Sequence, residues 1–79
     1  MEPLHEALRL LKRQAQLEEQ MRKPGGIRLA DERELFALRE RLTTFPVAAR
    51  AVLEAAHRLH RPVDTLSPLD VERTISDVD

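Results

Sequence analysis

The sequence predicts an all-α protein: a small helical bundle with a long N-terminal helix, a Pro-Gly-Gly hinge, an antiparallel helical hairpin and a short C-terminal helix. Apolar residues recur at the spacing of an amphipathic helix along most of the chain. Proline and glycine cluster between these periodic segments, where helices end and begin. We expect a single domain over residues 1–79, with the first helix in 1–23, the hinge in 24–30, the hairpin in 31–61 and an acidic segment in 62–79.

Composition limits how this domain can be stabilised. A chain of 79 residues buries a smaller share of its surface than a larger domain does, so its margin of stability is thin. It contains no Cys, which excludes disulfides and thiolate metal sites, and its only aromatic residues are Phe36 and Phe45. The apolar residues are mainly Leu and Ala, and Ala adds little buried surface. These features favour a dimer or a complex with a partner protein.

Charge is balanced overall but uneven along the chain. The 13 basic and 14 acidic residues give a net charge of −1, so no single-sign field covers the molecule. Residues 62–79 carry one basic residue, Arg73, against the acids Asp64, Asp70, Glu72, Asp77 and Asp79. We find neither a secretory signal nor an apolar run of membrane-spanning length, so we expect a cytoplasmic protein.

The first helix has a continuous apolar face. Pro3 suits the first helical turn, and nothing before Pro24 interrupts the helix. The residues on this face are Leu4, Ala7, Leu8, Leu10, Leu11, Ala15, Leu17 and Met21. Gln14 and Glu18 fall within the same half of the helix. They are either a buried polar pair that sets the register of a helix pairing, or hydrated residues near a frayed helix end.

Pro24-Gly25-Gly26 ends the first helix and is expected to act as a hinge. After it, Ile27 and Leu29 are predicted to be extended and to pack inward. Asp31 is the expected N-cap of the second helix, whose buried stripe is predicted to be Leu35, Leu38, Leu42 and Phe45. Phe36 lies about 100° from that stripe, so it should face a second surface, either the first helix or another subunit.

The connector Thr43-Thr44-Phe45-Pro46 leads into the third helix, which Pro62 ends. The apolar face of this helix is predicted to be Ala48, Ala49, Val52, Leu53, Ala55, Ala56 and Leu59. Ser67-Pro68-Leu69-Asp70 has the pattern of an N-cap, a first-position proline and a capping-box acid. A short fourth helix is therefore expected from about Pro68 to Ile75.

The lengths of the helices indicate where a partner would bind. The first helix spans about 30 Å and the next two about 20 Å each, so a hairpin of the second and third helices leaves part of the first uncovered. The predicted partner-binding residues are Leu10, Gln14, Leu17, Glu18, Met21 and Phe36. The partner is expected to be another protein, a second copy of the chain, or both, with homodimerisation through the first helix.

One motif has the spacing of metal ligands. Glu54, His57 and His60 follow one another at three-residue steps, and Glu-x-x-His occurs in di-iron helical bundles. Such centres need two of these motifs facing each other and further inward carboxylates, whereas His57 falls on the solvent side of its helix. Both His residues are also explained by the C-terminal end of the helix dipole, which favours a cation. We therefore expect no metal and no cofactor.

The second and third helices also fit a DNA-binding helix-turn-helix, in which Arg50, His57, Arg58 and Arg61 would face phosphates and base edges. Against this, the connector has no Gly, Glu54 lies within the proposed contact face, and the balanced charge supplies little attraction for DNA. Nucleic acid is thus the less favoured partner, and no membrane partner is expected.

No Ser/His/Asp arrangement has a context that indicates nucleophilic catalysis, so enzyme activity is not expected. The function we expect is protein–protein interaction, as a small adaptor, chaperone-like protein or inhibitory subunit that acts through amphipathic helices. A small helix-turn-helix DNA-binding regulator is the alternative. An enzyme whose site forms between subunits is the third candidate.

Overall fold

The computed structural model describes the backbone of residues 2–78 and the side chains of residues 3–76. It contains the helices α1 (Glu2–Arg22), α2 (Leu29–Leu42), α3 (Pro46–Leu59) and α4 (Pro68–Val78), with a 3₁₀ turn, η1 (Val63–Thr65), between α3 and α4. No strand occurs within residues 2–78, and the predicted all-α class is confirmed. Asp79 and the side chain of Asp77, two of the acids counted above, lie outside the described parts.

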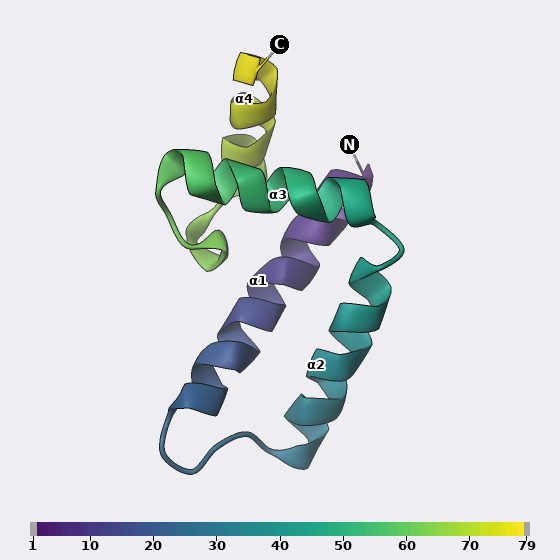
Figure 1. Cartoon of the computed structure of the whole chain (residues 1–79), viewed down its shortest axis with the longest axis vertical. Coiled ribbons are helices and arrows are strands. Elements are labelled where there is room, and N and C mark those ends of the chain that lie inside the picture. The colour runs from purple at the N-terminus through teal and green to yellow at the C-terminus, as the bar shows by residue number, and fades with distance from the viewer. Residues whose placement is uncertain (1, 79) are drawn as a thin grey trace.

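Figure 1 shows α1 and α2 side by side and antiparallel, with α3 crossing the N-terminal end of α1. The chain then returns along α1 through η1, and α4 extends away from the crossing, at the end opposite the 24–26 loop. The principal extents are 44 × 25 × 14 Å, and the radius of gyration is 13.2 Å, against about 12 Å for a compact domain of this length. The α1–α2 hairpin therefore projects from the crossing as a single layer of two helices.

The larger hydrophobic cluster lies where α1, α3, η1 and α4 meet. Its buried members are Leu4, Ala7, Leu8, Leu11, Val52, Ala55, Leu66 and Val71. Small residues on α3 let its backbone approach α1 closely, which suits the crossing. Leu53 and Leu59 were predicted to share the buried face of α3 but are exposed. Leu53 lies about 100° around the helix from Val52, which takes the contact with α1 instead.

A second cluster joins α1 to α2. Leu10 and Leu17 from α1 are buried against Leu35 and Leu38 from α2, and Ile27, Leu42 and Phe45 pack partly buried around them. The predicted stripe of α2 is thereby confirmed. Leu42 and Phe45 also pack against the larger cluster, so they belong to both.

The antiparallel pair is formed by α1 and α2 and not by α2 and α3. The prediction that residues 31–61 form an antiparallel hairpin is therefore wrong, although the fold class is right. The loop after α1 reverses the chain, and α2 then runs back along the second half of α1. Leu10 is 2% exposed and Leu17 is 0% exposed, because α2 covers them. The expected overhang on α1 is therefore largely absent, and a partner cannot reach these two leucines in this fold.

The reversal depends on two glycines. Gly25 has φ 99° and Gly26 has φ 70°, a region that L side chains rarely adopt, and the Gly26 N–H donates to the Lys23 carbonyl at 3.1 Å. A Cβ at either glycine would meet no atom within 4 Å, so the requirement is for the backbone angle and not for space. The predicted hinge is therefore a tight reversing loop between two packed helices.

The start of α2 differs from the prediction. Leu29 is the first helical residue and the extended Arg28 is the N-cap, with no side-chain cap, so Asp31 lies in the first turn. The Glu32 N–H donates to the Arg28 carbonyl at 2.9 Å, which closes that turn. Leu29 is exposed rather than packed inward, because it joins the helix on the side away from α1. Ile27 does pack against the α1–α2 cluster, as predicted.

The third helix ends in a Schellman motif. His60 adopts a left-handed conformation, with φ 54° and ψ 41°, while its N–H donates to the His57 carbonyl and the Arg61 N–H donates to the Ala56 carbonyl. His60 therefore stands where glycine is usual, and it terminates the helix.

The predicted capping box of α4 is confirmed. The Ser67 N–H donates to Asp70 Oδ2 at 3.0 Å, and the Asp70 N–H donates to Ser67 Oγ at 3.2 Å. The Ser67 backbone N–H, then the Ser67 side chain, lowers the pKa of the Asp70 carboxyl, and Arg61 acts in the same direction. The helix runs to Val78, three residues beyond the predicted Ile75.

Candidate functional site

An open groove lies along the outer side of α2. Its volume is about 420 Å³, and it is lined by Met21, Leu29, Glu32, Arg33, Leu35, Phe36 and Arg39. We call it the α2 groove. Phe36 is 65% exposed, Leu29 is 63% exposed and Met21 is 48% exposed, so three large apolar side chains meet water in one place. Two of them, Met21 and Phe36, are among the predicted partner-binding residues.

Helix geometry explains why this groove is apolar. Leu35 and Leu38 turn toward α1, and Phe36 lies about 100° around the helix from Leu35, out of reach of that contact. Met21 lies on the last turn of α1, where α2 is only beginning. The sequence therefore places Phe36 and Met21 outside the α1–α2 cluster, beside Leu29.

The charged side chains of α2 divide in the same way. On the side toward α1, Glu34 accepts from Arg13 at 2.7 Å and Arg41 pairs with Glu6 at 3.4 Å. On the outer side, the exposed residues Glu32, Arg33, Arg39 and Glu40 form no ion pair within the part of the chain whose side chains are described. The outer face of α2 thus carries charged side chains that form no ion pair with the described side chains, together with apolar side chains that are exposed to water.

Gln14 and Glu18, the polar pair predicted to contact a partner, bond to each other. Gln14 Nε2 donates to Glu18 Oε1 at 2.8 Å, and both residues are half-buried. Gln14 Oε1 is buried and has no hydrogen-bond partner among the described residues. The structure therefore brings this pair together within α1, away from the exposed apolar residues of the α2 groove.

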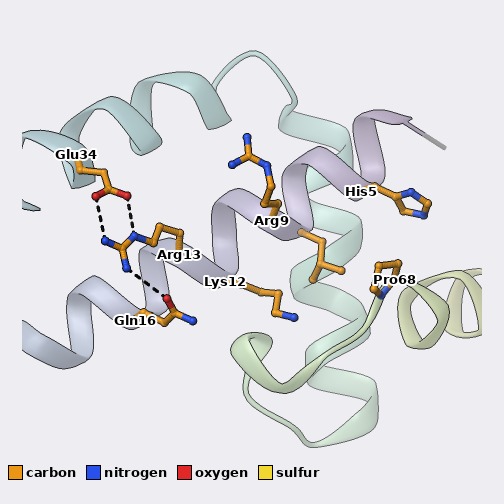
Figure 2. Close-up of a pocket in the computed structure, with 8 residues that line it drawn as sticks. His5, Arg9, Lys12, Arg13, Gln16, Glu34 and Pro68 are labelled. Atoms are coloured by element: carbon orange, nitrogen blue, oxygen red, sulfur yellow. Dashed lines mark hydrogen bonds and ion pairs between the residues drawn. The ribbon is translucent and has the colours of Figure 1, made fainter.

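A second groove, of about 600 Å³, runs along α1 and is basic (Figure 2). Its lining residues are His5, Leu8, Arg9, Lys12, Arg13, Gln16, Glu34 and Pro68. Arg13 donates to both Glu34 oxygens, at 2.7 and 3.1 Å, and points toward α2 (Figure 2). Lys12 Nζ donates to the Leu66 carbonyl at 2.8 Å. A cationic groove is not expected from the composition, because the basic and acidic residues are nearly balanced.

The polar groups of this groove already connect elements of the fold. Arg9 donates to Glu6, at 2.6 and 3.2 Å, and His5 Nε2 lies 2.7 Å from Glu72 Oε1 on α4. The Arg9–Glu6 pair lies within α1, whereas Arg13 ties α1 to α2, Lys12 ties it to the segment after η1, and His5 ties it to α4. The groove therefore acts as a set of structural contacts rather than as an open anion site.

Acid is expected to weaken the fold through the ion pairs of Glu34 and Glu6 and through the capping box of Asp70. Hydrogen bonds from Arg13 lower the pKa of Glu34, those from Arg9 lower the pKa of Glu6, and the pKa of Asp70 is lowered as described above. Because the folded-state pKa lies below the unfolded value of about 4, the stabilisation is present above that value and is lost as the pH falls through the folded-state pKa. Melting temperatures should hold down to about pH 5 and fall between about pH 4 and 2.

Thermal melts followed by circular dichroism at a series of pH values check this, and Glu34→Gln should show a shallower fall than the wild type. A melting temperature that stays constant or rises on acidification from about pH 5 to pH 2 would contradict the assignment.

The Glu54-x-x-His57-x-x-His60 motif does not form a cluster. Glu54 pairs with Arg58 at 3.5 Å, the two imidazole centroids are 6.4 Å apart, and His60 is the helix-ending residue. Within the described residues, no group of three or more His, Asp or Glu side chains is placed to hold a metal ion.

Two of the residues predicted to face DNA are engaged with the chain's own groups. Arg58 pairs with Glu54, and Arg61 pairs with Asp70 at 3.3 Å and donates to the Thr65 carbonyl. Arg50 and His57 remain beside Leu53 and Glu54 in a shallow depression of α3. This face therefore offers little free positive charge to a phosphate backbone.

No protein-family model, curated protein or solved structure matches the chain. None of the described helices combines the length and the apolar character needed to cross a membrane.

Proposed function

We propose that this chain is a small protein–protein interaction module that binds its partner through the α2 groove. One observation carries the proposal: Met21, Leu29 and Phe36 are exposed together on the hairpin, where the molecule is a single layer of two helices. Such a surface suits an adaptor, a chaperone-like protein or an inhibitory subunit that acts through amphipathic helices. We propose further that it works in the cytoplasm, without a cofactor and without catalysis of its own.

Physical considerations support this use of the groove. Burying a Phe, Leu or Met side chain contributes roughly 1.5–3 kcal/mol, which is a large amount beside the thin stability margin of a 79-residue chain. Protein interfaces are enriched in aromatic residues, Met and Arg, and the α2 groove brings together Phe36, Met21, Arg33 and Arg39. A helix laid along a groove of this kind is a recurrent mode of recognition.

Replacing Phe36 by Asp is expected to abolish partner capture while leaving the fold intact, because the side chain is exposed and touches neither core cluster. Tagged wild type and Phe36→Asp would be compared by affinity purification, followed by binding measurements with the purified partner; the affinity should fall at least about 100-fold. Circular dichroism should show the same helix content for both.

Val47→Asp is the matched control, since Val47 is 82% exposed on α3, away from the α2 groove. It should bind the partner like the wild type. Retention of the partner by Phe36→Asp, or an equal loss with Val47→Asp, would contradict the proposal.

A further inference from the structure

We infer that the partner seated in the α2 groove is a second copy of this chain, with the two α2 helices antiparallel around a twofold axis at Phe36. The inference rests on the proposed function, because it names the partner for the same surface. It moves the expected homodimer contact from α1, whose Leu10 and Leu17 are buried, to the outer face of α2.

The centre of the contact is a line of exposed residues. Leu29, Phe36 and Thr43 follow one another at seven-residue steps, so they lie within about 20° of one line along the helix. All three are exposed. A twofold axis at Phe36 places the two Phe36 rings against each other and each Leu29 against Thr43 of the second copy.

The charges on either side of this line are self-complementary. Glu32 and Arg39 lie on one side of it, four residues before and three residues after Phe36. Arg33 and Glu40 lie on the other side, three residues before and four residues after Phe36. A twofold rotation about an axis perpendicular to the helices brings the same side of both copies together, but the order of the residues along that side is reversed in the second copy. Glu32 then faces Arg39 of the second copy, and Arg33 faces Glu40, so both flanks bring opposite charges together.

The direction of pairing follows from the helix ends. A parallel pair would also place opposite charges on the flanks, as Glu32 against Arg33 and Arg39 against Glu40. It would, however, bring both α2 N-termini and both Arg28 side chains together, and each N-terminus carries partial positive charge. The antiparallel pair sets each N-terminus beside a C-terminus and keeps the two α3 crossings at opposite ends.

A charge exchange tests this arrangement. Arg39→Glu should weaken dimerisation at least about tenfold, because both Glu32 contacts become repulsive. The double variant Glu32→Arg with Arg39→Glu should restore wild-type dimerisation in the antiparallel pair. In a parallel pair the same double variant makes every flank contact repulsive. Sedimentation equilibrium at low ionic strength measures the dimer constant, and melting curves verify that each variant folds.

Cross-linking gives a second readout, which is clean because the chain has no native Cys. Packed helices about 8–10 Å apart bring facing Cα atoms within disulfide range, so Phe36→Cys should form a covalent dimer under mild oxidation. Leu29→Cys should not cross-link to itself, since its copies lie about 21 Å apart, but it should cross-link to Thr43→Cys when the two variants are mixed.

The expected results are a wild-type dimer, its loss with Arg39→Glu, its return with the double variant, and the Leu29–Thr43 cross-link. A wild type that stays monomeric at high concentration, a double variant that stays weak, or a Leu29→Cys self cross-link overturns the inference. The proposed function survives a monomeric wild type if Phe36→Asp still abolishes capture of a different protein, so the two failures are distinguishable.

Discussion

Replacing Leu17 by Ala is expected to lower the free energy of unfolding by about 2–5 kcal/mol. Leu17 is fully buried between α1 and α2, and the hairpin has no third layer that could close the resulting cavity. A domain of 79 residues is stable by only about 4–12 kcal/mol, so the loss is a large fraction of the total. Thermal and urea unfolding at one fixed protein concentration measure it, and the melting temperature should fall by at least about 10 °C.

Met21→Ala is the matched control for this prediction. Met21 lies one turn further along the same predicted face of α1, yet it is 48% exposed in the single chain. At a protein concentration too low for dimerisation, its truncation should therefore cost under about 1 kcal/mol. Equal losses from both variants would mean that α2 does not cover Leu17 in solution. In that case part of the apolar face of α1 would be uncovered, as the sequence predicts.

Replacing Leu66 by Ala is the other change with a large expected effect, again about 2–5 kcal/mol of unfolding free energy. Leu66 is fully buried although it lies in the irregular segment between η1 and α4. It joins Leu8 and Leu11 of α1 and Val52 of α3 in the larger cluster. Losing it should loosen the whole segment after α3, which unfolding curves and amide hydrogen exchange in α4 would detect.

The exposed Leu69, three residues later, supplies the control. Leu69→Ala leaves both clusters untouched and should change the stability by no more than about 0.5 kcal/mol. If the two variants melt alike, residues 62–78 are an appendage and not part of the core.

The local features of the fold could be predicted because their signals lie within a few residues of one another. The capping box at Ser67 and Asp70 and the proline starts of α3 and α4 are each decided by neighbouring atoms. The N-cap of α2 was misplaced because Leu29 and Ala30 both favour a helix and extend it beyond Asp31.

The pairing of helices could not be predicted in the same way. The leucines of α1 fit equally well against α2, against α3 or against another subunit, since burial of apolar surface has no direction. The outcome depends on how the 24–26 loop aims α2, and a glycine pair permits several directions. Phe36 could still be placed outside the contact, because its angle from Leu35 is the same whichever surface Leu35 meets.

The charge pattern of the outer face cannot be recognised from the sequence alone, because the sequence does not show which charged residues of α2 form ion pairs with α1. In the sequence, Glu34 and Arg41 resemble Glu32 and Arg39. Ion pairs with Arg13 and Glu6 distinguish Glu34 and Arg41 from the charged residues of the outer face, which are Glu32, Arg33, Arg39 and Glu40.

Leu42 and Phe45 belong to both hydrophobic clusters, and this divides the molecule into regions of unequal local stability. The end of the α1–α2 hairpin near the glycines is stabilised only by the cluster between these two helices. Local unfolding therefore requires the least free energy at this end. As the opening advances toward Leu42 and Phe45, it must disturb α3 as well, and from that point it becomes global unfolding. Amide protection should therefore rise steadily along both helices of the α1–α2 hairpin, from the glycines toward the end where Leu42 and Phe45 lie. A partner that binds the outer face of α2 should raise amide protection most in this least stable region.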